Sequence, residues 1–211
     1  MAFTHLTSRN PVNAITISTG FKPEERAQAA RLYWQAFGPK LANILGPEPR
    51  AHAFFQRALD PTHAICARDA HGVLLGMAGF KTPQGMFANG SMRDLAAVYG
   101  WLSLIWRVPL LMMLERELEP RTLLMDGLFV DTAARGRGVG TMLLDAIADE
   151  ARRRNLIRVR LDVIDSNNRA RALYERRGFV AGKTSQLGPL RRVFGFASVT
   201  TMTLALADKR A

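Results

Sequence analysis

The sequence lacks the features that mark disulfide-rich, exported or membrane-spanning proteins. It has one cysteine, Cys66, so no intrachain disulfide or cysteine-rich metal site can form. Its first ten residues lack the basic and then apolar pattern of a secretory signal. The most apolar stretch, 95–114, is broken by Arg107 and Pro109. We therefore expect a cytoplasmic protein without a membrane span.

Metal-ligand spacing and interdomain linkers are missing as well. His5, His52, His63 and His71 show no ligand pattern, so we expect them to be structural, and Cys66 to be a buried small residue. No tract rich in Gly, Ser or Pro is long enough to join two domains. A content of 48% hydrophobic and 22% charged residues is typical of a folded domain. We expect one domain over 1–211 that holds no metal.

What the sequence has in excess is positive charge. Its net charge of +11 favours an anionic partner, which leaves nucleic acid, an acidic membrane or a phosphorylated cofactor open. From Arg135 to Arg177 there are 11 Arg against 6 Asp and Glu, which favours a bound polyphosphate at this segment. The arginines are not interleaved with aromatic residues and form no helix-turn-helix pattern, so no nucleic acid is expected.

Hydrophobic periodicity predicts a β-α-α-β-β order for 1–81. Strands are expected at 14–18, 63–68 and 73–80, the last two as a hairpin, with helices at about 23–37 and 48–59. The segment 82–119 is expected to be a helical insertion that covers one side of the sheet. Ser91 and Asp94 form a capping-box pattern there, and Pro109 is expected to kink a helix that continues to Glu117.

The second half predicts a strand-loop-helix-strand unit with a parallel crossover. Strands are expected at 123–130 and 156–164, and helices at 141–154 and 168–177, all within a core of 120–184. Closing strands follow at 179–183 and 199–206, in a final segment and tail of 185–211. The predicted fold is an α/β (α+β) domain with a mixed central sheet of six or seven strands flanked by helices.

The loop before the helix at 141–154 has the clearest chemical meaning. It reads Arg135-Gly136-Arg137-Gly138-Val139-Gly140, and its glycines let backbone N–H groups converge at a helix N-terminus, which favours a pyrophosphate. The dinucleotide pattern G-x-G-x-x-G fails at its third glycine. A Walker A loop fails because Gly140 is followed by Thr141 and Met142.

The loop is similar to the R/Q-x-x-G-x-G/A signature of the GNAT superfamily of N-acetyltransferases, through Arg135, Gly138 and Gly140. The segment 167–179 resembles the N-x-x-A-x-x-L-Y-x-x-x-G-F segment of that family at every specified position. The run 128–130 resembles the family's bulged strand before the loop. Together these resemblances cover about a quarter of the chain.

The resemblance implies acetyl-CoA as the donor and direct transfer to a primary amine in a ternary complex. It implies that the strands ending at Val130 and Ile164 splay apart, so that backbone groups contact the pantetheine arm and a backbone N–H near Leu128 polarises the thioester. The cofactor-binding residues that it implies are Leu128, Phe129, Val130, Arg135, Gly136, Arg137, Gly138, Val139, Gly140, Thr141 and Asn167.

The resemblance also makes Tyr174 the general acid for the leaving thiolate, although helical spacing is equally met if Tyr174 only packs in the core. We select Asp126 as the candidate base, because strand alternation puts its side chain on the face of Leu128, close to the expected thioester. The alternative for Asp126 is an ion pair with an arginine. Glu115 and Glu117 are weaker candidates, more typical of solvated helix charges.

The acceptor is expected to be a small-molecule or peptide amine, and no motif names it. Tyr99, Trp101, Trp106 and the run 111–114 either line an acceptor pocket, form a homodimer surface or pack as an amphipathic helix. The acids Glu115, Glu117 and Glu119 either attract a cationic amine or face solvent. Two other functions stay open: a catalytically silent acyl-CoA-binding domain and a basic nucleic-acid-binding protein.

Overall fold

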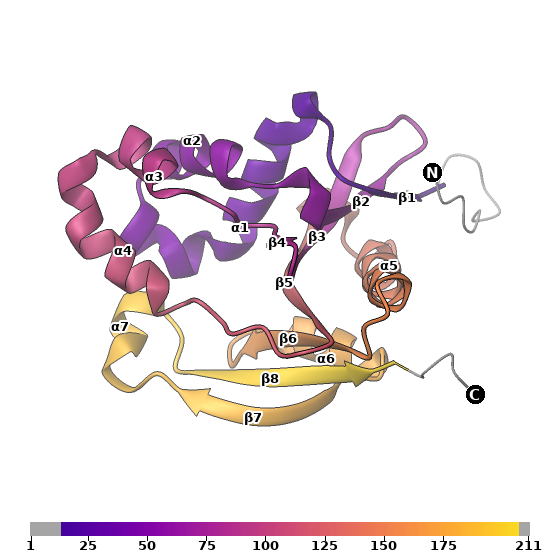
Figure 1. Cartoon of the computed structure of the whole chain (residues 1–211). Coiled ribbons are helices and arrows are strands. Elements are labelled where there is room, and N and C mark those ends of the chain that lie inside the picture. The colour runs from indigo at the N-terminus through magenta and orange to yellow at the C-terminus, as the bar shows by residue number, and fades with distance from the viewer. Residues whose placement is uncertain (1–13, 207–211) are drawn as a thin grey trace.

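The computed structural model describes residues 14–206, which form an eight-stranded mixed sheet with helices on both faces (Figure 1). The strand order is β1-β2-β3-β5-β6-β8-β7, with β4 paired to β3. Only β5 and β6 are parallel, as the predicted crossover requires. The strands are β1 Thr16–Thr19, β2 Ala64–Arg68, β3 Leu74–Thr82, β4 Gly85–Met86, β5 Thr122–Val130, β6 Arg158–Ile164, β7 Val180–Gln186 and β8 Ser198–Ala205.

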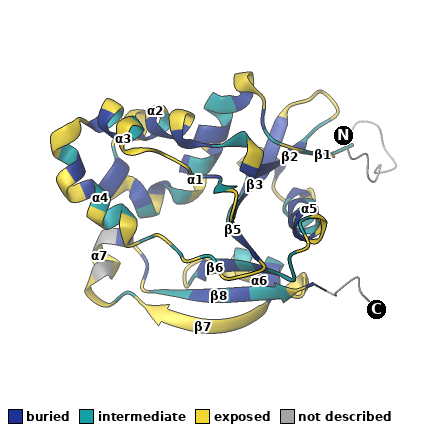
Figure 2. Ribbon diagram, in the orientation of Figure 1, coloured by how far each residue is buried: buried dark blue, intermediate teal, exposed yellow. Residues whose placement is uncertain are grey.

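Two hydrophobic clusters cover the two faces of the sheet (Figure 2). One is formed mainly with α1 and α2, and the other with α5 and α6. Side chains alternate along β6, where Val159, Leu161 and Val163 are buried in the cluster formed with α5 and α6, here termed the α5 cluster. The helices are α1 Arg26–Leu45, α2 Glu48–Ala58, α3 Met92–Tyr99, α4 Leu104–Met112, α5 Val139–Arg153, α6 Asn168–Arg176 and α7 Arg191–Phe194.

Helix α1 is longer than predicted. It begins after a short turn at Pro23–Glu25 and runs through Pro39 to Leu45, whereas the predicted helix ended near Phe37. Proline removes one helical hydrogen bond. The last turns nevertheless bury Leu41, Ile44 and Leu45 in the core, and burying such side chains contributes about 1.5–3 kcal/mol each. Packing therefore outweighs the local preference.

The segment 82–119 agrees with the prediction at its capping box but differs from it in where its helices break and end. The capping box is confirmed, since Ser91 Oγ accepts from Asp94 N at 3.1 Å and Asp94 Oδ2 accepts from Ser91 N at 3.0 Å. The break lies at Gly100, where φ is 79°, and not at Pro109, which lies inside α4. Residues 114–121 are not helical.

The two insertion helices also pack on α1 and α2 and not mainly on the sheet. The last carbonyls of a helix lack helical partners. Here the Tyr99 hydroxyl donates to the Leu45 carbonyl, and Arg107 Nε donates to the Ile44 carbonyl at 2.8 Å. These two hydrogen bonds hold the insertion helices against the end of α1.

Candidate functional site

Strands β5 and β6 separate after one short parallel stretch. Their pairing joins Thr122–Leu124 to Arg158–Arg160 and stops there. Beyond it β5 stays on β3 and β6 stays on β8, so the strands diverge (Figure 1). The facing backbone edges beyond Leu124 and Arg160 therefore have no strand partner. This is the splayed arrangement that the resemblance implied.

The loop that follows β5 presents an array of unpaired N–H groups. Asp131 Oδ1 accepts from Ala133 N at 2.9 Å and caps the short turn Thr132–Ala134. Gly136 and Gly138 then have φ values of 83° and 81°, which only glycine adopts without strain. Within residues 14–206, none of the backbone N–H groups from 136 to 141 donates to a protein acceptor. Such an array at the start of α5 suits an anion.

The side chains around this loop are free to add charge. Arg135 and Arg137 are exposed, and neither forms an ion pair with a carboxylate of the described chain. A Cβ at Gly136 or Gly138 would meet nothing within 4 Å, so the space above the N–H groups is open. The residues therefore fit the pyrophosphate of a CoA molecule. Val139 is buried and anchors α5, while Thr141 is half-buried.

Gly140 lies between β5 and α6, the elements that carry the 128–130 and 167–179 segments. A Cβ at this position would lie 3.3 Å from Leu173 Cδ2, 3.6 Å from Leu128 Cδ2 and 3.8 Å from Val130 Cγ2. Leu128 and Val130 belong to β5, and Leu173 to α6. The structure thus brings the loop, the strand before it and the 167–179 segment into direct contact.

Tyr174 lies in α6, and Asn167 lies at its N-terminus. Tyr174 is buried in the α5 cluster, with its ring centroid 5.8 Å from that of Phe179. Burial raises the pKa of Tyr174 to about 12, which keeps the phenol protonated at neutral pH. Asn167 Oδ1 accepts from Ala170 N at 3.2 Å, so Asn167 is the N-cap of α6.

Asp126 lies on the opposite face from the predicted one. A β-bulge pairs Gly79 with Gly127 and Phe80 with Met125, which leaves Asp126 without a partner on β3. The extra residue reverses the alternation. Leu128 therefore packs in the α5 cluster, while Asp126 lies on the α1 face, where its charge acts on Tyr33. The expectation that Asp126 and Leu128 share a face is wrong.

Arg116 bridges the two separating strands on that face. Its Nη2 lies 3.4 Å from Asp126 Oδ1, and its Nη1 lies 3.3 Å from Asp162 Oδ2 on β6. Thr201 Oγ1 donates to Asp162 Oδ1 at 2.8 Å. Burial raises the pKa of Asp126, while the charge of Arg116 acts against that rise. Sequence reasoning missed Arg116, because it lies 46 residues from Asp162 in a segment that was expected to be helical.

Two of the other acids of this segment, Glu115 and Glu119, form ion pairs. Glu115 lies 3.4 Å from Lys81 Nζ, and Glu119 lies 2.9 Å from Arg160 Nη1. Glu115, Glu117 and Glu119 are exposed, but they lie outside any helix, which corrects the expectation of solvated helix charges.

The aromatic residues of the insertion differ in exposure. Tyr99 is buried, whereas Trp101 and Trp106 are exposed. A groove of about 700 Å³ lies along α1 and the α1–α2 turn, between Trp34, His52 and Asp131. Gln35 Nε2 on the groove wall donates to Thr132 Oγ1 at 3.4 Å. The groove therefore adjoins the start of the glycine-rich loop 135–140, here termed the pyrophosphate loop.

The described histidines and the cysteine form no ligand cluster with one another. His63 is buried against Phe80, His52 lies 3.5 Å from Glu48, and His5 is outside the described residues. Burial raises the pKa of the Cys66 thiol to about 12. Residues 14–206 contain no group of three or more His, Cys, Asp or Glu that would suit a metal ion. In the same range no single helix is long and apolar enough to cross a membrane.

Comparison with known proteins places this geometry among acetyltransferases. The acetyltransferase (GNAT) family model matches residues 26–179. A mycothiol acetyltransferase from Beutenbergia cavernae is 52% identical over 50 residues, which is 24% of this chain and 17% of that protein.

Solved structures agree in fold. An N-acetyltransferase from Staphylococcus aureus Mu50 has a TM-score of 0.62 at 15% identity, over 90% of this chain and 100% of that one. A putative acetyltransferase from Salmonella typhimurium, solved with its cofactor acetyl-CoA, has a TM-score of 0.56 at 18% identity, over 93% of this chain and 96% of that one. At these identities the likeness concerns the fold alone.

Proposed function

The chain belongs to the acetyltransferase (GNAT) family, whose donor is acetyl-CoA, and from this premise we propose direct transfer of the acetyl group to a primary amine in a ternary complex. The acceptor is a small-molecule or peptide amine. One observation carries the proposal. A Cβ placed on Gly140 of the loop would lie 3.3 Å from Leu173 Cδ2, and Leu173 is the neighbour of Tyr174 in α6. This contact supports the proposal that the phosphate site and the candidate acid belong to one site.

The loop and β5 bind the donor in this proposal. The free N–H groups of 136–141 bind the pyrophosphate, and the exposed guanidinium groups of Arg135 and Arg137 add charge-assisted hydrogen bonds. The backbone edge of 128–130, which lacks a partner strand, contacts the pantetheine arm. Asn167 caps α6 at 3.2 Å and so holds Tyr174 in place beside that arm.

Acetyl-CoA supplies an activated thioester, whose carbonyl carbon accepts the amine nitrogen. As that bond forms, a backbone N–H near Leu128 stabilises the negative charge that develops on the carbonyl oxygen. The C–S bond then breaks, and the leaving sulfur takes a proton. Tyr174, whose phenol is protonated at neutral pH, donates this proton. The nitrogen loses a proton as it becomes an amide, and this proton restores the phenol of Tyr174.

The amine must be neutral before it attacks, and Asp126 is our candidate base. Burial raises the pKa of this carboxyl, which makes it a stronger base than an exposed aspartate. It lies on the α1 face of β5, where Arg116 contacts it at 3.4 Å. An acceptor that binds there must compete with Arg116 for the carboxylate.

The decisive test of the acid is Tyr174→Phe in a thiol-release assay with a panel of amines, polyamines, amino acids, aminoglycosides and peptides. We expect kcat to fall by about 100-fold, with the affinity for acetyl-CoA unchanged. Tyr99→Phe is the matched control, because it removes the hydroxyl of another buried tyrosine at the far end of α3. Unchanged turnover of Tyr174→Phe would remove the acid assignment.

A second pair of variants separates the candidate bases. Asp126→Asn should lower kcat/KM and abolish the acid limb of its pH profile, whereas Glu115→Gln should change neither, because Glu115 is exposed and paired with Lys81. An equal loss in both variants would contradict a specific role of Asp126. If acetyl-CoA raises the Tm but no amine raises thiol release, the chain is a silent acyl-CoA-binding domain.

A further inference from the structure

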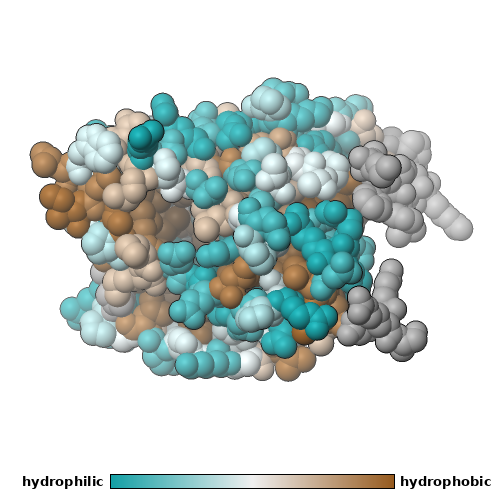
Figure 3. Space-filling model, viewed as in Figure 1, coloured by the Kyte–Doolittle hydropathy of each residue, from teal (hydrophilic) through white to brown (hydrophobic). Residues whose placement is uncertain are grey.

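One end of the molecule carries an unusual concentration of exposed apolar side chains. The bend after α3 and helix α4 form this surface, here termed the apolar corner. Figure 3 shows it as the hydrophobic area over α4 at the left end of the view. Leu102 is 85% exposed and Ile105 is 75% exposed, values far above those of the core. The apolar corner consists of Trp101, Leu102, Ile105, Trp106, Met112 and Met113.

The fold holds the apolar corner firmly in this exposed position. Leu104 is buried between the exposed residues and anchors α4 in the core. The Arg107 guanidinium lies 4.1 Å from the Trp106 ring centroid and 4.4 Å from that of Tyr99, while its Nε bonds the Ile44 carbonyl. The exposure of Leu102 and Ile105 therefore belongs to a packed helix and not to an unpacked segment. Contiguous exposed apolar surface of this kind marks an interaction site.

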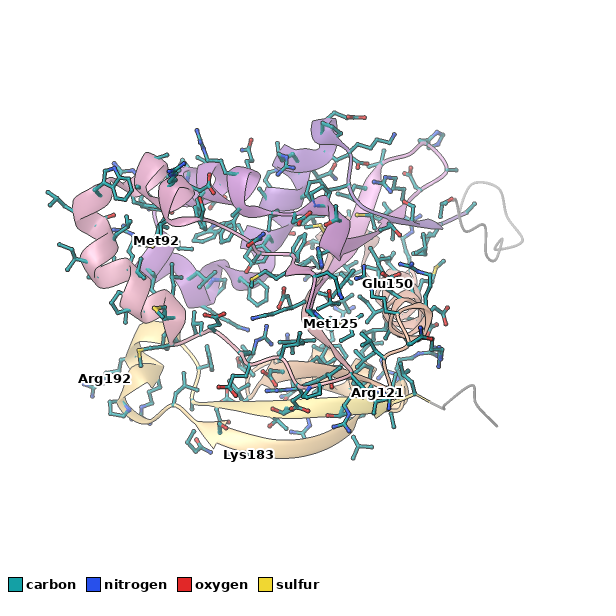
Figure 4. All side chains as sticks on the ribbon, viewed as in Figure 1. Met92, Arg121, Met125, Glu150, Lys183 and Arg192 are labelled. Atoms are coloured by element: carbon teal, nitrogen blue, oxygen red, sulfur yellow. The ribbon has the colours of Figure 1, made fainter. Side chains whose placement is uncertain are left out.

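Arginines surround the apolar corner. They come from α2, α3 and α7, all are exposed, and none forms an ion pair with a carboxylate of the described chain. The charge of Arg50 reaches Tyr99 and Arg107, and that of Arg57 reaches Asp94, which places both near the corner. In Figure 4 Met92 and Arg192 lie at this same end, on either side of α4. The arginine ring consists of Arg50, Arg57, Arg93, Arg191 and Arg192.

This combination fits the surface of an anionic lipid bilayer. Tryptophans suit the interface between headgroups and acyl chains, and a ring of arginines attracts anionic headgroups. Helices α3 and 101–112 are bent by 115°, so each arm alone is far shorter than the hydrocarbon core, and the bend projects Trp101 and Leu102 outward. Such a corner inserts shallowly and does not span.

A second copy of this chain fits less well. A symmetric dimer brings the same surface of each subunit together. Here it would face one ring of exposed arginines with another, and the two rings would repel each other. We propose that the apolar corner and the arginine ring bind the surface of membranes rich in anionic lipids. Helix α5, which follows the loop 135–138, lies at the opposite end of the molecule from α4 in the view of Figure 1.

The test is sedimentation of the full chain with phosphatidylcholine vesicles that contain about 30% phosphatidylglycerol, against vesicles of phosphatidylcholine alone. We expect binding to the anionic vesicles, a blue shift of tryptophan emission that Trp101→Phe reduces, and weaker binding as salt rises. The triple variant Trp101→Ser, Leu102→Ser, Ile105→Ser should lower the partition coefficient by at least about 10-fold. Its Tm should match that of the wild type, because the three residues are exposed.

Matched controls separate this surface from general charge or hydrophobicity. Val73→Ser with Val180→Ser removes exposed apolar residues elsewhere, and it should leave binding unchanged. Arg93→Gln with Arg192→Gln should weaken binding at low salt more than Lys183→Gln, which lies on β7 (Figure 4).

Three outcomes would overturn the proposal. The first is no binding to anionic vesicles, and the second is equal binding by the triple variant, which would mean charge alone. The third is a dimer in sedimentation velocity that the triple variant abolishes while vesicle binding is absent, which would assign the corner to a second copy. None of these readouts depends on acetyl transfer.

Discussion

Two glycines of the loop 135–140, only two residues apart, should differ in how strongly alanine destabilises the fold. Gly138 has φ of 81°, and an added Cβ would meet nothing within 4 Å. Gly138→Ala therefore introduces backbone strain without a clash, which costs about 1–2 kcal/mol. Gly140 lies in the first turn of α5 and has no positive φ. Alanine gains up to about 1 kcal/mol there from helix propensity.

The added methyl group at Gly140 is 3.3 Å from Leu173 Cδ2, which is the movable end of a side chain. The contact offsets part of the propensity gain. We expect Gly140→Ala to leave the free energy of unfolding within about 1 kcal/mol of the wild type, and Gly138→Ala to lie about 2 kcal/mol below Gly140→Ala. Urea denaturation of both variants measures this difference, and the m-value should stay constant.

Binding of acetyl-CoA separates strain from function. Gly138→Ala should weaken it, because the substitution shifts the unpaired N–H groups of 136–141. Gly72→Ala is the matched control, since Gly72 has the same φ of 81° and equally open surroundings in a hairpin turn. It should cost similar stability and leave the affinity unchanged in titration calorimetry. Equal stability of Gly138→Ala and Gly140→Ala, or equal loss of affinity in Gly72→Ala, would refute the reasoning.

Two predictions concern buried charge. Glu25 accepts from Arg68 Nε at 2.7 Å and Nη2 at 2.6 Å, so Glu25→Gln should cost about 3 kcal/mol in urea denaturation, whereas exposed Glu24→Gln should cost nothing measurable. Because the hydrogen bond from Arg68 lowers the pKa of Glu25 in the fold, this loss should shrink as the pH falls below about 4.3. Burial lowers the pKa of Lys40 to about 8, so the fold disfavours its charged form and Lys40→Met should raise the Tm at pH 7. That gain should disappear between pH 8 and about 10.4, and exposed Lys183→Met should show no gain at pH 7.

Local patterns predicted much of the donor side of the site. Helix α5 begins at Val139, two residues before the predicted start, while α6 begins at Asn168 and ends before Gly178, as predicted. Short-range geometry decides these features, because a helix start, a left-handed glycine and an N-cap involve residues within four positions of one another.

Longer-range features escaped the sequence. The β-bulge that turns Asp126 to the α1 face arises from the pairing of β5 with β3, and alternation along β5 alone predicts the opposite face. The insertion packs on α1 because Tyr99 and Arg107 satisfy carbonyls that lie 54 and 63 residues earlier. Neither partner is visible from its own segment.

The sequence by itself therefore determined the α/β fold, and it predicted the donor half of the proposed site, a glycine-rich loop and a tyrosine on the adjoining helix. Those elements follow from local hydrogen bonds and from the conformational freedom of glycine. Only the tertiary structure decided which face carries Asp126, which arginine bridges β5 and β6, and which apolar residues remain exposed. Such features depend on the register and packing of distant segments, where burial of side chains outweighs local preference.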